Sequence, residues 1–333
     1  MTPRRGLMVG ALGALGAVAC RGQEREAPGA GLGAAVAGAV RQGLAEATAV
    51  VSPWPCAELE QEVTAAAPPG WELRDGALRP SHRSSKRTVA FVGDAGGAAE
   101  STLARLRLAA RAFAEREVSA VFSLGGLGED AAAIEATLRA LTSGPAYVVV
   151  ALPGDLEPLP AHRQAIAALA RDGLPVLDGS AVRWIELEGA TIGTLPGVPS
   201  RDRLPAADEG CAFDAAALAA TAAELGRRPG VKILATWTAP RVGSAVTPAG
   251  DRELAQALAD NHIDVAVFGE RTETSTPAGE ASRGARALSA GLLDGEPRAP
   301  SAGTPPRPSA RLLELSGATP TWRALELSMQ PSR

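Results

Sequence analysis

Three carboxylates follow apolar stretches of the sequence directly, in turns that contain glycine or proline: Asp94, Asp155 and Glu157. Carboxylate oxygens are preferred ligands of Mg²⁺ and Ca²⁺, and three of them with water can complete the shell of one such ion. An ordinary structural role competes with this reading, because aspartate favours turns and acidic side chains favour the start of a helix. We therefore expect no bound cofactor, with one Mg²⁺ or Ca²⁺ as the alternative.

Imidazole ligands are scarce, since the chain has only three histidines, His82, His162 and His262. Transition metals in proteins are held largely by imidazole, thiolate and carboxylate groups. The sequence also lacks the glycine-rich P-loop pattern and the G-x-S-x-G pattern of a nucleophilic serine. These observations argue against a transition-metal site, a phosphate-cradling loop and a serine hydrolase.

The N-terminus has the pattern of an export signal: Arg4 and Arg5 precede an apolar stretch that is too short to span a bilayer. Small residues, Ala17 to Ala19, stand before Cys20, as in the lipobox of bacterial lipoproteins, although the usual leucine is Ala17 here. We expect Cys20 to be the lipidated mature N-terminus. The protein would then lie in the bacterial cell envelope, at the periplasmic or outer-membrane face, with the membrane as a partner through its lipid anchor.

Two further cysteines, Cys56 and Cys211, remain after lipidation of Cys20. Outside the cytoplasm such a pair can form a disulfide. Two separate buried thiols are the other reading, because the sequence does not show that the two residues meet.

Composition limits the class of partner. The chain has 333 residues, 46% of them hydrophobic, and a net charge of −4. This content is sufficient for a globular core, and no basic patch suited to nucleic acid is present. We therefore expect no nucleic-acid partner, and the protein or small-molecule ligand is unknown.

The sequence divides into four parts: a signal peptide (1–19), a lipidated tether rich in Gly and Ala (20–34), an extension (35–86) and a main domain (87–330). In the extension we expect a helix from Ala35 to Val51 and a hairpin from Trp71 to Leu78 around an Asp-Gly pair.

In the main domain short apolar strands alternate with amphipathic helices, which predicts a layered α/β fold with mixed sheets. The expected strands are Val89–Val92, Ala120–Ser123, Ala146–Leu152, Val182–Leu187, Thr191–Leu195, Lys232–Thr236, Val265–Phe268, Arg311–Leu315 and Trp322–Leu327. The segment from Thr272 to Ser309 is rich in Pro, Gly and Ser. It predicts a long surface loop with at most one short strand near Ala287 to Ala290.

Five of these strands end in short segments that resemble, in order and spacing, the metal-binding motifs of the calcineurin-like metallophosphoesterases. That family has D-x-H, G-D-x-x-D/E, G-N-H-D/E, a lone histidine and G-H-x-H at these places. The corresponding segments here are FVGDAG (91–96), FSLGG (122–126), LPGDLE (152–157), ILATWT (233–238) and VFGERT (267–272). Five matches in order, each after an apolar strand, make the resemblance moderately specific.

Most of the family's ligand positions carry other residues in this chain. Asp94 matches the first aspartate, Asp155 stands for the asparagine, and Glu157 keeps the acidic residue of the third motif. The histidines and the bridging aspartate are replaced by Gly96, Gly126, Leu156, Trp237 (or Thr236), Glu270 and Thr272. The resemblance thus implies an α/β/β/α sandwich without a dinuclear centre, because that chemistry needs two cations about 3.5 to 4 Å apart.

The resemblance also sets the functional expectation. We expect a catalytically degenerate domain that acts as a binding or scaffolding module, and not an enzyme. The alternative is a divergent phosphoesterase using one hard cation on Asp94, Asp155 and Glu157, with Glu270 as a further neighbour. Trp237 and Arg271 would either form a stacking and anion-binding pair in the old cleft, or fill space and neutralise carboxylates. An unrelated α/β domain whose glycines mimic the motifs is the third reading.

Overall fold

The computed structural model describes residues 67–74, 77–82, 86–144, 147–200, 211–241, 250–270, 278–282, 285–291, 293, 309–316 and 320–327. The expected signal peptide, tether and Ala35–Val51 helix lie outside these residues. So do Cys20, Cys56, Arg271 and Thr272. None of the described helices is long and apolar enough to cross a membrane.

Most of the described strands form two sheets. The first has the order β16-β15-β3-β4-β5-β6. Its centre is parallel, and each connection between neighbouring parallel strands runs through a helix. The strands are β3 (Lys86–Val92), β4 (Val118–Leu124), β5 (Val148–Leu152), β6 (Val176–Asp178), β15 (Ser309–Ser316) and β16 (Thr321–Glu326), and the helices are α2 (Glu100–Glu115), α3 (Ala131–Leu141) and α4 (Leu159–Arg171).

The second sheet has the order β1-β2-β7-β8-β11-β12-β14-β13 and mixes parallel with antiparallel pairs. Its strands are β1 (Trp71–Arg74), β2 (Ala77–Pro80), β7 (Trp184–Leu187), β8 (Ala190–Leu195), β11 (Val231–Thr236), β12 (Val265–Phe268), β13 (Ala278–Ser282) and β14 (Ala285–Ser289). Helices α5 (Ala215–Arg227) and α6 (Arg252–Asp260) belong to this half, and β9 (Val198–Pro199) pairs separately with β10 (Ala212–Phe213).

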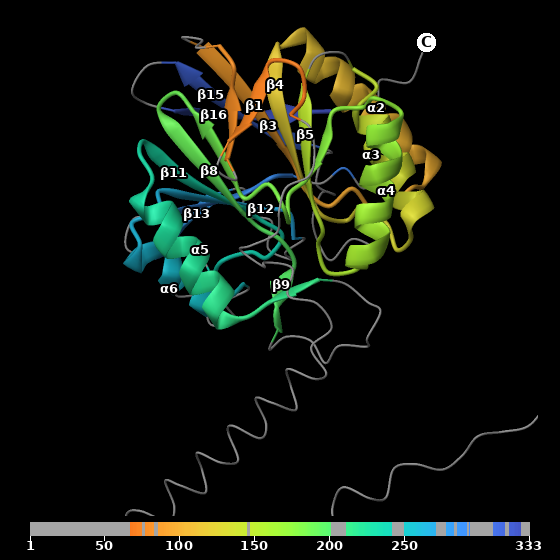
Figure 1. The fold of residues 1–333 in the computed structure, drawn as a ribbon. Coiled ribbons are helices and arrows are strands. Elements are labelled where there is room, and N and C mark those ends of the chain that lie inside the picture. The colour runs from red at the N-terminus through yellow and green to blue at the C-terminus, as the bar shows by residue number, and fades with distance from the viewer. Residues whose placement is uncertain are drawn as a thin grey trace, which may run out of the picture. The chain divides into compact units, whose positions relative to one another are not determined.

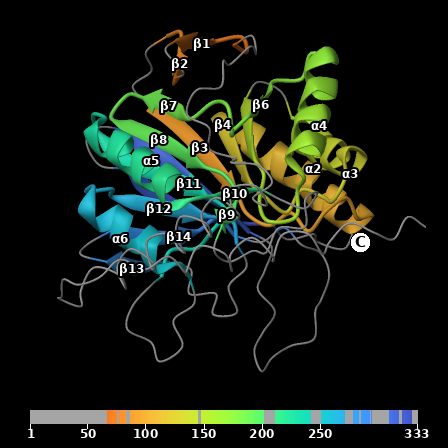
Figure 2. The same cartoon turned by 60° about the horizontal axis from the view of Figure 1, so that its bottom comes forward.

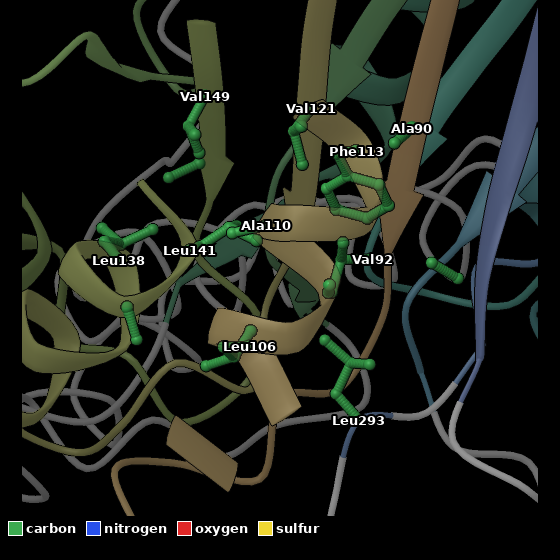
Figure 3. Packing of buried hydrophobic residues seen from close by; sticks show 14 of the residues in the cluster. Ala90, Val92, Leu106, Ala110, Phe113, Val121, Leu138, Leu141, Val149 and Leu293 are labelled. Atoms are coloured by element: carbon green, nitrogen blue, oxygen red, sulfur yellow. The ribbon is translucent and has the colours of Figure 1, made fainter. Parts of the chain in front are cut away.

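The two sheets face each other, and helices cover their outer sides (Figures 1 and 2). Strand β3 shows why, because alternate residues of a strand point to opposite faces. Val89 and Phe91 enter the core between the sheets, where Phe91 stacks on Phe122 at 5.1 Å between ring centroids. Ala90 and Val92 enter the core under α2 and α3, shown in Figure 3. The layers are therefore α/β/β/α.

The starts of three helices follow from the sequence in the same way. Asp130, Asp214 and Asp251 precede α3, α5 and α6, and each side chain accepts a hydrogen bond from a backbone N–H of the first turn, at 2.8, 2.7 and 2.6 Å. Such caps satisfy amide groups that have no partner within the helix.

The expected hairpin near Trp71 is present as the antiparallel pair β1 and β2. Strand β2 also pairs with β7, so the hairpin extends the second sheet, and Trp71 is buried in the core between the sheets. Strand β14 lies where one short strand was expected within the segment from Thr272 to Ser309. The prediction of a loop was wrong for β13, which forms a hairpin with β14, while β14 also pairs in parallel with β12. The short strand β6 was also missed.

Candidate functional site

The carboxyl ends of five strands meet at one edge of the domain: β3, β4 and β5 from the first sheet, β11 and β12 from the second. Backbone hydrogen bonds join the turns that follow them. The Asp94 N–H donates to the Gly269 carbonyl at 3.2 Å, and the Gly97 N–H donates to the Gly126 carbonyl at 2.9 Å. The Glu270 N–H donates to the Trp237 carbonyl at 2.8 Å. The described parts of the five motif segments are thus neighbours in space.

Asp94 and Gly126 are in direct apposition at this edge. One oxygen of Asp94, Oδ1, accepts a hydrogen bond from the Gly96 N–H at 3.0 Å. Gly126 has φ +70°, and a Cβ atom added to it would lie 2.3 Å from that same oxygen. The place where a bridging aspartate would begin is therefore already taken by the Asp94 carboxylate.

Trp237 packs its indole against the two neighbouring turns. A Cβ on Gly125 would lie 2.3 Å from its Cε3 atom, and a Cβ on Gly154 would lie 2.8 Å from its Cδ2 atom. The side chain is only 6% exposed. Glycine at both positions is what permits this close approach. The indole thus fills the space between the ends of β4 and β5.

Glu157 points into the protein. It is fully buried and accepts hydrogen bonds from the Gly154 N–H at 2.7 Å and from the Leu127 N–H. Burial raises the pKa of this carboxyl group, although the two amide donors oppose the rise. Both carboxylate oxygens are engaged with backbone amides, so Glu157 ties the β4 and β5 turns together.

The remaining motif residues that the structure describes do not complete a metal site. Leu156 stands on the surface, 51% exposed, next to the partly exposed Asp155. Glu270 accepts a hydrogen bond from the Ala239 N–H at 2.7 Å. Within the described part of the chain no three His, Cys, Asp or Glu side chains are grouped so that they could hold a metal ion. The described residues therefore do not fit the dinuclear centre of the calcineurin-like family.

A buried histidine near this edge was not assigned a role from the sequence. His162 of α4 is fully buried, with Nε2 3.2 Å from the Ala151 carbonyl and 3.6 Å from Asp178 Oδ1, while Nδ1 has no hydrogen-bond partner among the described residues. Burial alone would raise the pKa of Asp178, but hydrogen bonds with His162 and Ser180 outweigh it and the pKa is lowered. No sequence pattern pointed to this contact, because His162 lies outside the five motif segments.

Cys211 lies at the rim of the same edge and is disulfide-bonded. Its partner is not among the described residues, and both other cysteines, Cys20 and Cys56, stand outside them. The Cys211 carbonyl accepts a hydrogen bond from the Val198 N–H at 3.0 Å, and the neighbouring Gly197 N–H donates to the Pro153 carbonyl at 2.9 Å. The cysteine is therefore connected through two backbone bonds to the turn that carries Gly154.

Comparison with solved structures finds similar folds at low identity. The protein TT1561 of Thermus thermophilus matches 73% of this chain over 99% of its own length, with 15% identity and a TM-score of 0.52. A purple acid phosphatase from yellow lupin seeds matches with 11% identity, a TM-score of 0.41 and coverage of 76% of this chain and 54% of its own. A dimetal phosphatase from Danio rerio matches with 10% identity, a TM-score of 0.41 and coverage of 73% and 99%.

No protein-family model matches the chain, and no curated protein matches its sequence. The likeness to solved structures is one of fold. The predicted fold class, a layered α/β sandwich with mixed sheets, is confirmed.

Proposed function

We propose that this protein is a catalytically degenerate member of the metallophosphoesterase fold that acts as a binding or scaffolding module. The observation that carries the proposal is the packing of Trp237 against Gly125 and Gly154. An indole with 6% exposure leaves no room between these turns for a cation and its water. A domain whose cleft is closed by a buried side chain is suited to binding on its surface.

The chemistry of a two-metal hydrolase supports the same reading. Such a site needs two cations that share a bridging ligand, polarise the phosphoryl group and activate water. At the bridging position Gly126 has no side chain, and Leu156 and Trp237 are not metal ligands. Glu157, the third carboxylate of the single-cation alternative, directs both oxygens to backbone amides. We derive no hydrolytic step from these residues.

The test is hydrolysis of an aryl phosphate and of an aryl phosphodiester by the purified protein with Mg²⁺, Ca²⁺, Mn²⁺, Zn²⁺ or Fe²⁺ added. We expect no turnover above that of an Asp94→Asn variant. Mutation of the residues that hydrogen-bond to metal ligands already costs about 10 to 100-fold in affinity or activity, and here most of the ligand positions themselves carry other residues. Metal-dependent turnover that disappears in Asp94→Asn would establish the single-cation phosphoesterase instead.

We also propose that the protein is held at the cell envelope by a lipid on Cys20. The support is the short apolar stretch and the small residues before this cysteine. A Cys20→Ser variant, expressed in a bacterial host with a labelled fatty acid, should lose the label and accumulate as precursor. A Cys56→Ser variant is the matched control and should keep the label. Equal labelling of both variants would reject the anchor.

A further inference from the structure

A cavity of about 350 Å³ opens where β3 begins, at the edge of the domain opposite to the one where the five motif turns meet. Its polar lining carries both signs of charge: Arg79, His82 and Arg87 against Glu186 and Glu188. These residues come from β2, the turn after it, the start of β3, the end of β7 and the turn between β7 and β8. None of them belongs to the segments that resemble phosphoesterase motifs.

One pair of opposite charges in this lining is already satisfied. The Arg79 Nε donates to Glu186 Oε2 at 2.6 Å, and Glu186 Oε1 accepts from Arg228 Nη1 at 2.5 Å. These two arginines, Arg79 first, lower the pKa of Glu186. Arg228 is held in turn by Glu224 and by the face of Trp184, 4.9 Å from the ring centroid. Glu186 thus forms a fixed part of the cavity lining, and its negative charge is balanced by Arg79 and Arg228.

The second pair of opposite charges is not joined. Arg87 Nη2 donates to the His82 carbonyl, and Arg87 makes no ion pair with a carboxylate of the described chain. Burial lowers the pKa of Arg87, and attraction from Glu188 opposes this without a hydrogen bond. The imidazole of His82 has no described side-chain partner either. Among the described residues, the Arg87 guanidinium and the Glu188 carboxylate therefore line one cavity with most of their hydrogen-bonding capacity unused.

We propose that this cavity binds a small dipolar molecule with a carboxylate and an ammonium group, of the amino acid class. A guanidinium fork matches a carboxylate in a bidentate manner, which assigns that group to Arg87. Glu188 then receives the ammonium group, and His82 lies beside Arg87 as a further polar contact. A purely anionic ligand would face repulsion from Glu188, and a purely cationic one would face repulsion from Arg87.

The experiment is a titration of the full-length chain, purified in detergent, with glycine at constant ionic strength. The readout is the histidine ring NMR signals, with that of His82 identified by its loss in His82→Gln. We expect a saturable shift of the His82 signal in the millimolar range, because the groups are partly exposed. Acetate or methylammonium alone should bind at least about tenfold more weakly, since each satisfies one of the two charges.

Variants separate the two contacts. Arg87→Gln and Glu188→Gln should each weaken glycine binding at least about tenfold, while Arg107→Gln, on the exposed side of α2, should leave it unchanged. An unshifted His162 signal confirms that each variant is folded. Absence of a saturable shift up to ~50 mM glycine would overturn the proposal. So would binding of acetate or inorganic phosphate that is as tight as glycine binding and indifferent to Glu188→Gln, which would make this an anion site.

Discussion

Oδ1 of Asp94 lies where a side chain on residue 126 would have to begin, 2.3 Å from the Cβ position of Gly126. The backbone adds to this obstruction, because the Ala95 nitrogen lies 2.8 Å from the same point and Gly126 has φ +70°. An aspartate at this position would therefore require a rearrangement of the turn. A glycine at position 126 is therefore part of the packing of the domain.

The first prediction follows from this crowding. Gly126→Ala should destabilise the protein by more than Gly173→Ala, because Gly173 has a similar φ of +74° but open space around its Cβ position. The backbone conformation alone costs about 1 to 3 kcal/mol in both variants, so the difference reports the contact with Asp94 and Ala95. The measurement is urea unfolding of both variants.

A double variant sharpens this test. Asp94→Ala removes the nearest oxygen, so it should recover part of the loss caused by Gly126→Ala, but not all, since the Ala95 nitrogen stays in place. Equal destabilisation by Gly126→Ala and Gly173→Ala, with no coupling to Asp94, would contradict the packing described here.

The second prediction concerns Trp237. Trp237→Ala should cost about 3 to 5 kcal/mol in the free energy of unfolding, because it removes a buried indole and leaves a cavity against Gly125 and Gly154. Trp322→Ala is the matched control, since Trp322 is only half-buried, with its ring centroid 5.7 Å from that of Phe91, and should cost less. If the two variants lose equal stability, Trp237 does not fill the space between the ends of β4 and β5 as described.

Most of the fold could be predicted from the sequence, because strands and helices with clear apolar periodicity alternate along the chain. Strand β13 could not be predicted in this way, because the segment AGEAS (278–282) has little apolar character and forms a strand through pairing with its neighbour. Its partner β14 is in turn placed by β12. Such strands depend on tertiary contacts that a local pattern does not contain.

The sequence allowed the positions of the candidate site residues along the strands to be predicted, but not the directions of their side chains. The order of the strand ends indicated which turns would lie at the same edge of each sheet, because parallel strands bring their carboxyl ends to one edge. Nothing in the sequence separated an outward Glu157, able to meet a cation, from the buried Glu157 that accepts two backbone hydrogen bonds. The close packing of Trp237 against Gly125 and Gly154 could not be predicted either, since glycine has many structural roles.

The third prediction is a pH dependence that arises from Glu157. Burial raises its folded-state pKa above the unfolded value, so the folded state binds more protons in that interval. The associated stability is fully present below the unfolded pKa and is lost as pH rises through the folded pKa. Glu157→Gln cannot ionise, so its free energy of unfolding should decline less with rising pH across this interval.

The measurement is urea unfolding at a series of pH values. Glu129→Gln, which changes an exposed carboxylate, serves as control and should follow the unmodified protein. Parallel curves for Glu157→Gln and the unmodified protein would mean that the folded state does not raise the pKa of Glu157. Contributions from Asp178 are common to all three proteins and cancel in the comparison.

The last prediction concerns the disulfide of Cys211. Because Cys20 is the expected lipid site, the partner should be Cys56, so that unfolded, unreduced mature protein has no free thiol and gains two on reduction. Reduction should lower the free energy of unfolding by about 2 to 5 kcal/mol, because the crosslink closes a very long loop of chain. Cys56→Ser should match the reduced protein in stability and expose one thiol, from Cys211. Two reactive thiols before reduction, or a Cys56→Ser protein without a free thiol, would rule out this pairing.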